Sequence, residues 1–358
     1  MVTVLPTSLQ AALDFSATGA ECTVRLTPDI AFGAVSCGGY TASVMAKYAV
    51  LYASQQPKIC TQTDIRSAVA QFYRPIFPQS STTMKLREVS IGKGWSTLRV
   101  ELSQGGKVAA SVDVIVSNFS LPSLSLETKW QLSPPPHPVD LSKLESDSDP
   151  DWVSYQTAFY PDGFRRSDSY VKSFIPKTWP SDITHVEQWV VPGWDCLPLG
   201  SCAAEKEEDK ARWTNEMIQF VLDCSLPVEQ NYYPLKPGQH PPMGSVASTL
   251  SFAAIQKKAR EEGKPDWRAL EYDGSKVAQK HGIPGTLVMA TEIKKKLPPE
   301  GVRWLYLRTA VKSVMNGRVN REALLFDEAM ELVAISNHIV QIIPAGNKDQ
   351  KIEARASL

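Results

Sequence analysis

The sequence has 358 residues, 43% of them hydrophobic and 21% charged, which is the composition of an ordinary globular protein of one or two domains. Its 38 basic residues balance 38 acidic ones, so no net field would draw the chain onto nucleic acid or an anionic membrane. No apolar run approaches the roughly 18 residues of a membrane span, and residues 1–16 lack the pattern of a secretory signal. These features predict a cytoplasmic protein that binds neither nucleic acid nor a membrane.

The six cysteines are scattered, without the paired spacing of a zinc site or the density of a disulfide scaffold. We therefore expect free thiols, no metal and no other cofactor. Cys196 and Cys202 are close enough in sequence to close a small loop, although a reducing compartment disfavours a disulfide there.

The first 118 residues have the pattern of one strand, one helix and four further strands. A strand is predicted over 21–26, and Gly38 and Gly39 open an apolar run at helical spacing that continues to Tyr52. Glycine-containing turns separate the later members of four strand-like runs, which cover 63–73, 82–90, 96–102 and 108–116. This order of elements predicts a hotdog domain.

The rest of the chain repeats that order after a change in composition. Residues 119–165 are rich in Pro, Ser and Asp, which is typical of a linker or a wrapping crossover. The second half, 166–345, is predicted to hold a helix over about 205–224 and five strands, over 185–191, 286–295, 303–314, 320–326 and 332–343. Residues 346–358 form a tail.

Residues 227–284 interrupt the second half with a Pro-rich stretch and two predicted helices, over 248–262 and near 275–280. This insertion could be a lid over a site or a surface ornament. Residues 108–111 (Val-Ala-Ala-Ser) resemble 333–336 (Val-Ala-Ile-Ser) at the start of the last strand of each half, a match that makes Asp113 the counterpart of His338. We expect an α+β double hotdog, with two tandem antiparallel sheets each wrapped around a central helix.

Several segments, taken in order, carry a family resemblance. They are 35–40 (Val-Ser-Cys-Gly-Gly-Tyr), 71–75 (Gln-Phe-Tyr-Arg-Pro), the hairpin over 94–109, 220–223 (Phe-Val-Leu-Asp) and 332–338. This set resembles the acyl-CoA thioesterase II family and its thioesterase-like relatives, which are common in fungal gene clusters for secondary metabolite biosynthesis.

The resemblance implies a thioester-hydrolysing site in which an aspartate, a threonine or serine, and a glutamine hold a water. Asp223 matches the aspartate beside the apolar stripe of its helix; alternatively, it is a solvated acid at the helix flank. His338 stands where the family has glutamine, and it could accept a proton or be a hydrogen-bonded structural histidine. Counting from the strand end lands on Val288, so we choose Thr286 on the same face, with Thr291 on the other.

Three further residues complete the predicted site. Gly38 and Gly39 would let backbone amides approach an oxyanion at a helix N-terminus, or they form only a tight turn. The resemblance adds Arg74 to the substrate-binding residues. Cys37 is not assigned as a nucleophile, because no histidine has a motif relation to it. The run 294–296 (Lys-Lys-Lys) would suit phosphates or an acidic carrier, but such runs are more often solvated strand ends.

Three functions fit this pattern. The first is hydrolysis of acyl-CoA or acyl-carrier thioesters, polyketide-derived ones included, through a water held by Asp223 and His338. The second is a cyclase, dehydratase or isomerase acting on a polyketide-like molecule, which the displaced threonine and the insertion favour. The third is a ligand-binding protein with a vestigial site, because a fold alone does not fix a function. Two fused hotdogs could stay monomeric or form a homo-oligomer.

Overall fold

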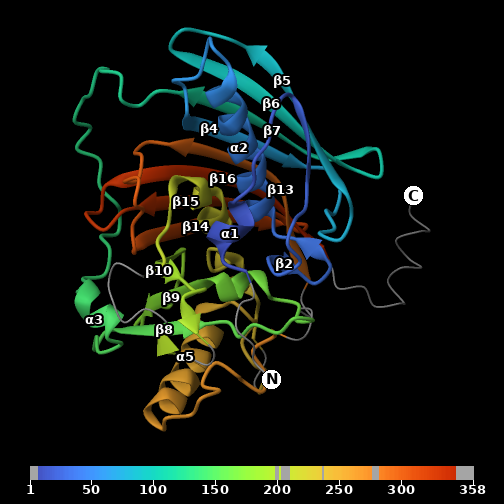
Figure 1. Cartoon of the computed structure of the whole chain (residues 1–358). Helices are drawn as coiled ribbons and strands as arrows, with labels where there is room; N and C mark the ends of the chain where they lie inside the picture. Colours follow the sequence, from blue (N-terminus) through green and yellow to red (C-terminus); the bar gives the residue numbers. More distant parts are fainter. Residues whose placement is uncertain (1–6, 198–200, 203–209, 236–237, 276–281, 344–358) are drawn as a thin grey trace.

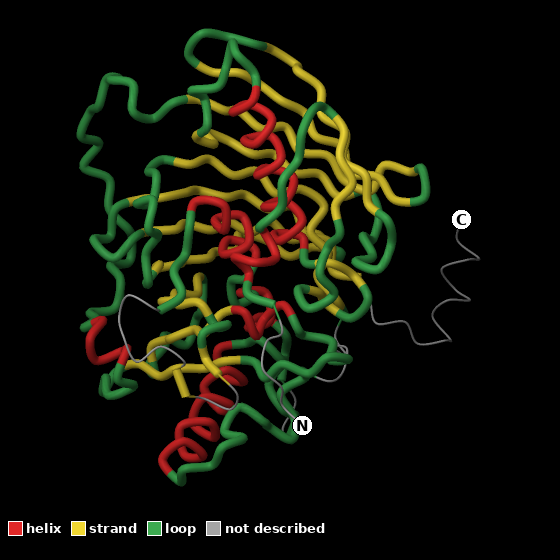
Figure 2. Tube along the Cα trace, viewed as in Figure 1, coloured by secondary structure: helices red, strands yellow, loops and turns green. Residues whose placement is uncertain are grey.

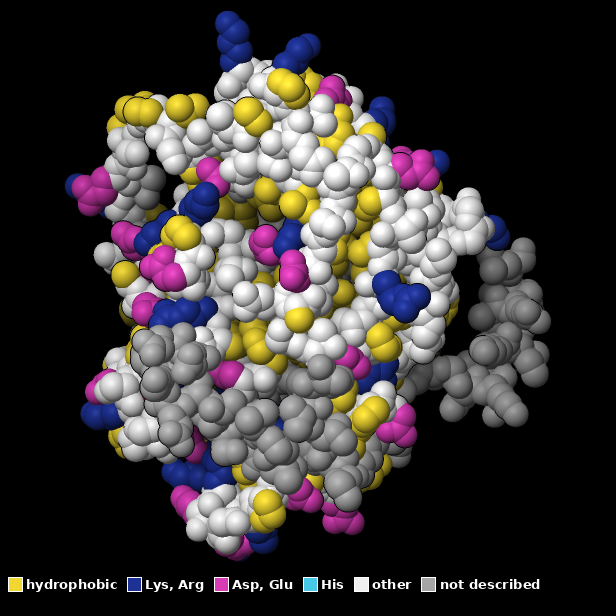
Figure 3. All heavy atoms as spheres, in the orientation of Figure 1, with side chains coloured by type: hydrophobic (Ala, Val, Ile, Leu, Met, Phe, Trp, Pro, Cys, Tyr) yellow, Lys and Arg dark blue, Asp and Glu magenta, His cyan; other side chains and the backbone are white. Residues whose placement is uncertain are grey.

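The computed structural model describes residues 7–197, 201–202, 210–235, 238–275 and 282–343. Within them, twelve strands form one continuous curved sheet, in the order β1-β5-β6-β7-β4-β13-β16-β15-β14-β10-β9-β8 (Figures 1 and 2). The helix α2 lies inside the curve of this sheet (Figure 1). Lys and Arg are interspersed with Asp and Glu over the face in Figure 3, as the balanced composition predicts.

The first half has the predicted order of one strand, one long helix and four strands. The helix α2, Gly38–Gln55, is apolar on nearly every side and is therefore buried. A short helix α1, Leu9–Leu13, precedes the sheet, and β2, Ala31–Phe32, pairs with β3, Val35–Ser36, in a separate hairpin. The sheet strands of this half are β1 Glu21–Val24, β4 Asp64–Phe72, β5 Thr82–Ser90, β6 Trp95–Gln104 and β7 Lys107–Ser117.

The second half repeats the topology of the first. Its order β10-β14-β15-β16-β13 matches β1-β5-β6-β7-β4 strand for strand, which confirms the double hotdog. The corresponding elements are β10 His185–Pro192, α4 Ile218–Asp223, β13 Ile283–Ile293, β14 Leu305–Met315, β15 Arg318–Phe326 and β16 Leu332–Ile343.

Two further strands extend this sheet beyond β10. They are β8, Trp152–Gln156, and β9, Val171–Pro176, joined by a segment that contains the 3-10 helix η1, Ser167–Tyr170. The strand β8 lies inside 119–165, which we predicted to be a linker or a wrapping crossover, so the sheet of the second half begins earlier than residue 166. A short hairpin of β11, Cys196–Leu197, and β12, Ser201–Cys202, follows β10 and sets Cys196 opposite Cys202.

The central helix of the second half is much shorter than the predicted 205–224, part of which lies outside the described residues. Trp213 forms a β-bridge with Val302, through hydrogen bonds in both directions, which keeps the chain extended up to that point. Helical structure therefore begins only at the 3-10 helix η3, Asn215–Met217, and continues into α4. The helix ends just after Asp223, at Cys224.

The two halves are joined by a ladder between β4 and β13. Residues 67–71 of β4 pair antiparallel with 288–292 of β13, and buried side chains of both halves form one core that includes α2 and α4. Because β4 and β13 pair with each other, neither has an exposed strand edge at this seam, and the sheets of the two halves form one continuous sheet.

The crossover 119–150 wraps the outer face of the second half's sheet. It includes the helix α3, Leu141–Glu145, and it packs Leu132 and Val139 against a cluster of large aromatic side chains. Glu187 is buried beneath it, where it contacts His137 of the crossover and Arg308 of β14. The crossover is thus held against the sheet by apolar packing and by the contact between His137 and Glu187.

The insertion reaches the far edge of the sheet. After the 3-10 helix η4, Val228–Tyr232, the helix α5, Val246–Glu261, packs beside β8, away from α2 (Figure 1). The side-chain amide of Gln256 accepts from the backbone N–H of Gln156 and donates to its carbonyl, as a neighbouring strand would. The helix α5 therefore covers an edge strand and is not a lid over α2. The short helix predicted near 275–280 falls almost wholly outside the described residues.

No helix of the described residues is both long and apolar enough to cross a bilayer, and no group of three or more His, Cys, Asp or Glu among them is arranged to hold a metal.

Candidate active site

The two central helices touch where α2 begins and α4 ends. A Cβ at Gly39 would lie 2.5 Å from the Cβ of Asp223 and 2.7 Å from the carbonyl oxygen of Gln219, so only glycine allows this approach. The Gly39 amide donates a 2.7 Å hydrogen bond to Asp223 Oδ2. The first turn of the 18-residue helix α2 thus holds the carboxylate, which the helix dipole also favours.

His338 faces the other carboxylate oxygen. Its Nδ1 lies 3.9 Å from Asp223 Oδ1, which is too long for a direct hydrogen bond. The His338 side chain is 0% exposed and that of Asp223 11% exposed, so Asp223 is the outer member of the pair. Within the described residues, His338 Nδ1 is a buried atom with no hydrogen-bond partner.

Three side chains continue from His338 across the inner face of the sheet. His338 Nε2 lies 2.9 Å from Ser336 Oγ, and Ser336 Oγ lies 2.9 Å from Thr291 Oγ1. Thr291 in turn donates a 2.9 Å hydrogen bond to Oε1 of Gln219, one turn before Asp223 on α4. The five residues therefore link α4, β13 and β16 around one buried cluster.

The pKa of His338 is lowered to about 4, chiefly by burial; Asp223 acts to raise it, and the nearby charge of Arg321 acts to lower it. Arg321 stands opposite His338 on β15 and is paired with the buried Glu229 of η4 at 2.6 Å. The imidazole is therefore neutral near neutral pH, and one of its nitrogens carries a lone pair that can accept a proton.

The threonine in this cluster is Thr291 and not the predicted Thr286. The register between β13 and β16 shifts between Thr286 and Val288, which adds a residue and breaks the simple alternation of faces. Thr291, opposite Ser336, therefore shares the inner face with Thr286, opposite Val340, contrary to our count. Within the described residues, Thr286 makes no hydrogen bond to Asp223 or His338.

Asp113 is not the counterpart of His338. The backbone N–H groups of Lys294 and Lys295 both donate to the carbonyl of Val333, just as those of Tyr73 and Arg74 donate to the carbonyl of Ala109. Val333 therefore corresponds to Ala109, and the alignment based on the sequence match is shifted by one residue. Asp113 lies on the outer face in an ion pair with Arg99. The true first-half counterparts of the inner-face cluster are all buried and apolar: Ala70 for Thr291, Val112 for Ser336 and Val114 for His338.

The remaining predicted residues lie around the cluster. Gly38 borders Asp223, since a Cβ there would lie 3.2 Å from Oδ2, whereas the Gly39 amide already binds the carboxylate and is not free for an oxyanion. Arg74 is exposed, two residues beyond Phe72, whose ring lies 3.5 Å from the same Cβ position at Gly38. The Cys37 thiol is buried and donates to Asp223 Oδ2 at 3.6 Å.

The lysines of 294–296 are each paired with an acid. Lys294 pairs with Glu292, Lys295 with Asp327 and Glu331, and Lys296 with Asp64. These pairs fit the solvated strand end that such a run usually forms.

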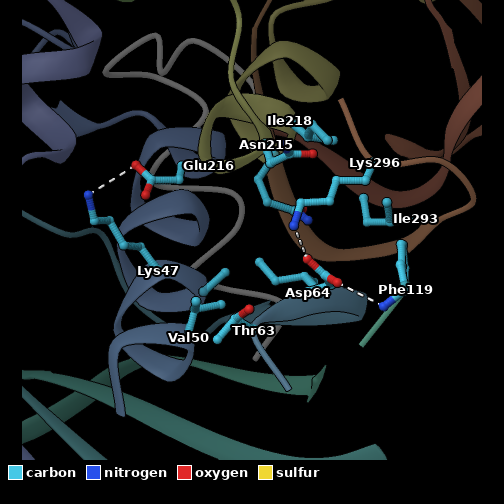
Figure 4. A pocket seen from close by; sticks show the side chains of 13 residues that line it. Lys47, Val50, Thr63, Asp64, Phe119, Asn215, Glu216, Ile218, Ile293 and Lys296 are labelled. Carbon is cyan, nitrogen blue, oxygen red and sulfur yellow. Dashed lines mark hydrogen bonds and ion pairs between the residues drawn. The ribbon is translucent and has the colours of Figure 1, made fainter. Parts of the chain in front are cut away.

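A cavity of about 170 Å³ opens beside the cluster, between α2 and the residues that begin η3 and α4 (Figure 4). Gln219 belongs both to its wall and to the hydrogen-bonded cluster. Two ion pairs that cross between the halves flank the cavity, Lys47 with Glu216 at 3.0 Å and Lys296 with Asp64 (Figure 4). Its apolar wall is formed by Ala46, Val50, Ile65, Phe119, Ile218 and Ile293.

Sequence reasoning missed two members of the cluster, although signals for both were present. Ser336 stands two residues before His338 on a strand and must share its face. Gln219 stands four residues before Asp223 on a helix and must lie one turn below it. Thr291 was missed because the count from the strand end landed on Val288, which lies opposite Ile339 on the other face.

Comparisons with known proteins agree with this architecture. The acyl-CoA thioesterase C-terminal domain matches residues 138–342, more than half of the chain, and the N-terminal domain of the same family matches 26–117. The thioesterase-like protein TwmA of Talaromyces wortmannii is 25% identical over an alignment 341 residues long, which covers 89% of this chain and 87% of TwmA.

Two solved structures share the fold. An acyl-CoA thioesterase II from Mycobacterium marinum superposes with a TM-score of 0.53 at 15% identity, covering 95% of this chain and all of that one. A hot dog protein of unknown function from Alicyclobacillus acidocaldarius gives 0.56 at 12% identity, covering 94% and 98%. With both domains of one family matched in order along a double hotdog, the chain belongs to the acyl-CoA thioesterase family.

Proposed function

We propose that the chain hydrolyses acyl thioesters, carried by coenzyme A or by a carrier protein, with a water held between Asp223 and His338. The observation that supports this best is the buried Nδ1 of His338, which has no partner among the described residues and lies 3.9 Å from Asp223 Oδ1. One water about 2.8 Å from each atom would span that separation.

In this reaction the water donates one hydrogen to His338 and the other to Asp223, and its lone pair faces the thioester carbon. Attack transfers a proton to His338 Nδ1 and forms a tetrahedral oxyanion. Its collapse breaks the C–S bond, and the leaving sulfur takes the proton from His338 Nδ1, which releases a carboxylic acid and a thiol and restores the neutral imidazole. The imidazolium is stabilised by the adjacent carboxylate, which the Gly39 amide holds in place. The Gly38 amide, at the N-terminus of α2, is the proposed oxyanion donor.

The cavity beside Gln219 is the proposed seat of the acyl group. Gln219 is one helical turn, about 5.4 Å, from Asp223, so an acyl chain whose carbonyl reaches Asp223 can extend past Gln219 into the apolar wall. A volume of about 170 Å³ is close to the roughly 150 Å³ of a cavity that accepts benzene. We therefore expect short or single-ring acyl groups as substrates.

The test is thiol release from a panel of acyl-CoA and acyl-carrier thioesters, measured for wild type and variants. We expect Asp223→Asn and His338→Ala each to lower kcat by roughly 10²–10⁴-fold. Asp113→Asn is the matched control, since Asp113 lies on the outer face and should leave activity unchanged. Wild type that releases thiol from no member of the panel would overturn the proposal.

A non-hydrolytic reaction is the second candidate. A neutral histidine in place of the family's glutamine can accept a proton from carbon and return it, as a cyclase, dehydratase or isomerase of polyketide-like molecules requires. The same panel separates the two: thioesters consumed without thiol release, with a changed acyl product by mass spectrometry, would favour this candidate.

A further inference from the structure

The hydrogen bonds that run from Gln219 to His338 have one allowed direction. Gln219 Oε1 can only accept, so the single hydroxyl proton of Thr291 is donated to it. Thr291 Oγ1 must then accept from Ser336, and Ser336 Oγ, having donated its only proton, must accept from His338. His338 therefore carries its proton on Nε2.

We infer that Gln219, Thr291 and Ser336 are positioning residues that fix His338 in the Nε2–H tautomer and so leave the Nδ1 lone pair facing Asp223. Each link of this chain is 2.9 Å long, and Ser336, Thr291 and Gln219 are 0%, 1% and 4% exposed, so solvent does not compete for these protons. Their first-half counterparts, Ala70 and Val112, have no hydroxyl group, so only the second half contains the chain.

The tautomer decides what can stand between Asp223 and His338. With a lone pair on Nδ1, two acceptors face each other 3.9 Å apart, and only a group with two protons to donate, such as water, satisfies both. With a proton on Nδ1, the imidazole would donate directly to the carboxylate and exclude that water. The catalytic consequence rests on the proposed hydrolysis, but the tautomer itself does not.

Nitrogen-15 NMR of histidine-labelled protein tests the tautomer directly, because protonated and bare ring nitrogens differ widely in chemical shift. The chain has five histidines, and the signal of His338 is identified by its loss in His338→Gln. We expect Nε2–H in wild type. In Thr291→Val the Ser336 hydroxyl loses its acceptor and donates to Nε2, which moves the proton to Nδ1. Thr291→Ser should restore Nε2–H.

Two further variants and one control separate the expected effect from a folding defect in Thr291→Val. Ser336→Ala removes the acceptor of Nε2–H and should also move the proton to Nδ1. Gln219→Glu can only accept, so it should keep the wild-type tautomer. Ser111→Ala, which removes a hydroxyl from the outer face of β7, should leave the His338 signal unchanged. Nδ1–H in wild type, or Nε2–H retained in both Thr291→Val and Ser336→Ala, would overturn the inference.

The separate effects on kcat and KM distinguish a positioning role of Thr291 from a purely structural one. We expect Thr291→Val to lower kcat about 100-fold with KM changed less than about twofold, and Thr291→Ser to recover most of the loss. A wild-type protein with the Nε2–H tautomer and no thiol release would refute the proposed function while leaving this inference standing. A wild-type protein that releases thiol but carries its His338 proton on Nδ1 would refute this inference while leaving hydrolysis standing.

Discussion

At Gly39, packing between the helices leaves no space for a methyl group. The nearest atoms to an added Cβ are the Asp223 Cβ, the Gln219 carbonyl oxygen and the Phe220 Cα, all under 3.0 Å and mostly backbone, so α2 and α4 would have to separate. We expect Gly39→Ala to lower the free energy of unfolding by roughly 1–3 kcal/mol, measured by urea denaturation. Gly94→Ala, where nothing lies within 4 Å, is the control, and equal stability of the two variants would contradict this packing.

His338 should also make stability depend on pH. Its folded pKa of about 4 is below the ordinary 6.5, so between these values the unfolded chain binds a proton that the folded chain does not, and stability falls as pH drops. The groups facing it are Asp223 on α4 and Arg321 on β15. We expect a loss on the order of 3 kcal/mol from pH 7 to pH 4 that His338→Gln lacks. Parallel pH profiles of the two proteins would show that burial does not set this pKa.

Among the elements, the crossover depends on one buried carboxylate. Burial acts to raise the pKa of Glu187, but hydrogen bonds from Tyr306, His137 and Arg308 hold it below its ordinary value. Glu187→Gln would leave Arg308, which is 5% exposed, without its buried counter-charge, at a cost of about 3–5 kcal/mol in unfolding free energy. Glu292→Gln breaks an exposed pair with Lys294 and should cost about 1 kcal/mol or less. Similar losses in both variants would contradict the anchoring role.

The elements also show where sequence reasoning stops. Apolar periodicity predicted α2 and the five hotdog strands of each half to within a few residues, because burial of one face selects apolar residues at regular spacing, but β8 and β9 were not predicted. The start of α4 could not be predicted, since the bridge between Trp213 and Val302 joins residues far apart in the chain. Asp223 and His338 were predicted and do lie together. Thr286 was chosen over Thr291 because the count from the strand end landed on Val288, and the bulge between Thr286 and Val288, which pairing sets, could not be foreseen.

For the molecule as a whole, the chain should hold one site and not two. The first half presents Ala70, Val112 and Val114 where the second presents Thr291, Ser336 and His338. We expect a non-hydrolysable thioether analogue of the best substrate to bind with a stoichiometry of one per chain by calorimetry. Two equivalent sites per chain would contradict this asymmetry.

The seam between β4 and β13 has an evolutionary consequence. If a single hotdog paired with its own copy, symmetry would place every residue in the assembly twice, so a substitution favouring chemistry in one copy would also disturb the packing of the other. Fusion into one chain removes that constraint while the twelve-stranded sheet keeps the paired arrangement. In a single chain the first half can keep an apolar inner face while the second carries polar side chains in its interior, an asymmetry that a symmetric pair of identical subunits cannot have.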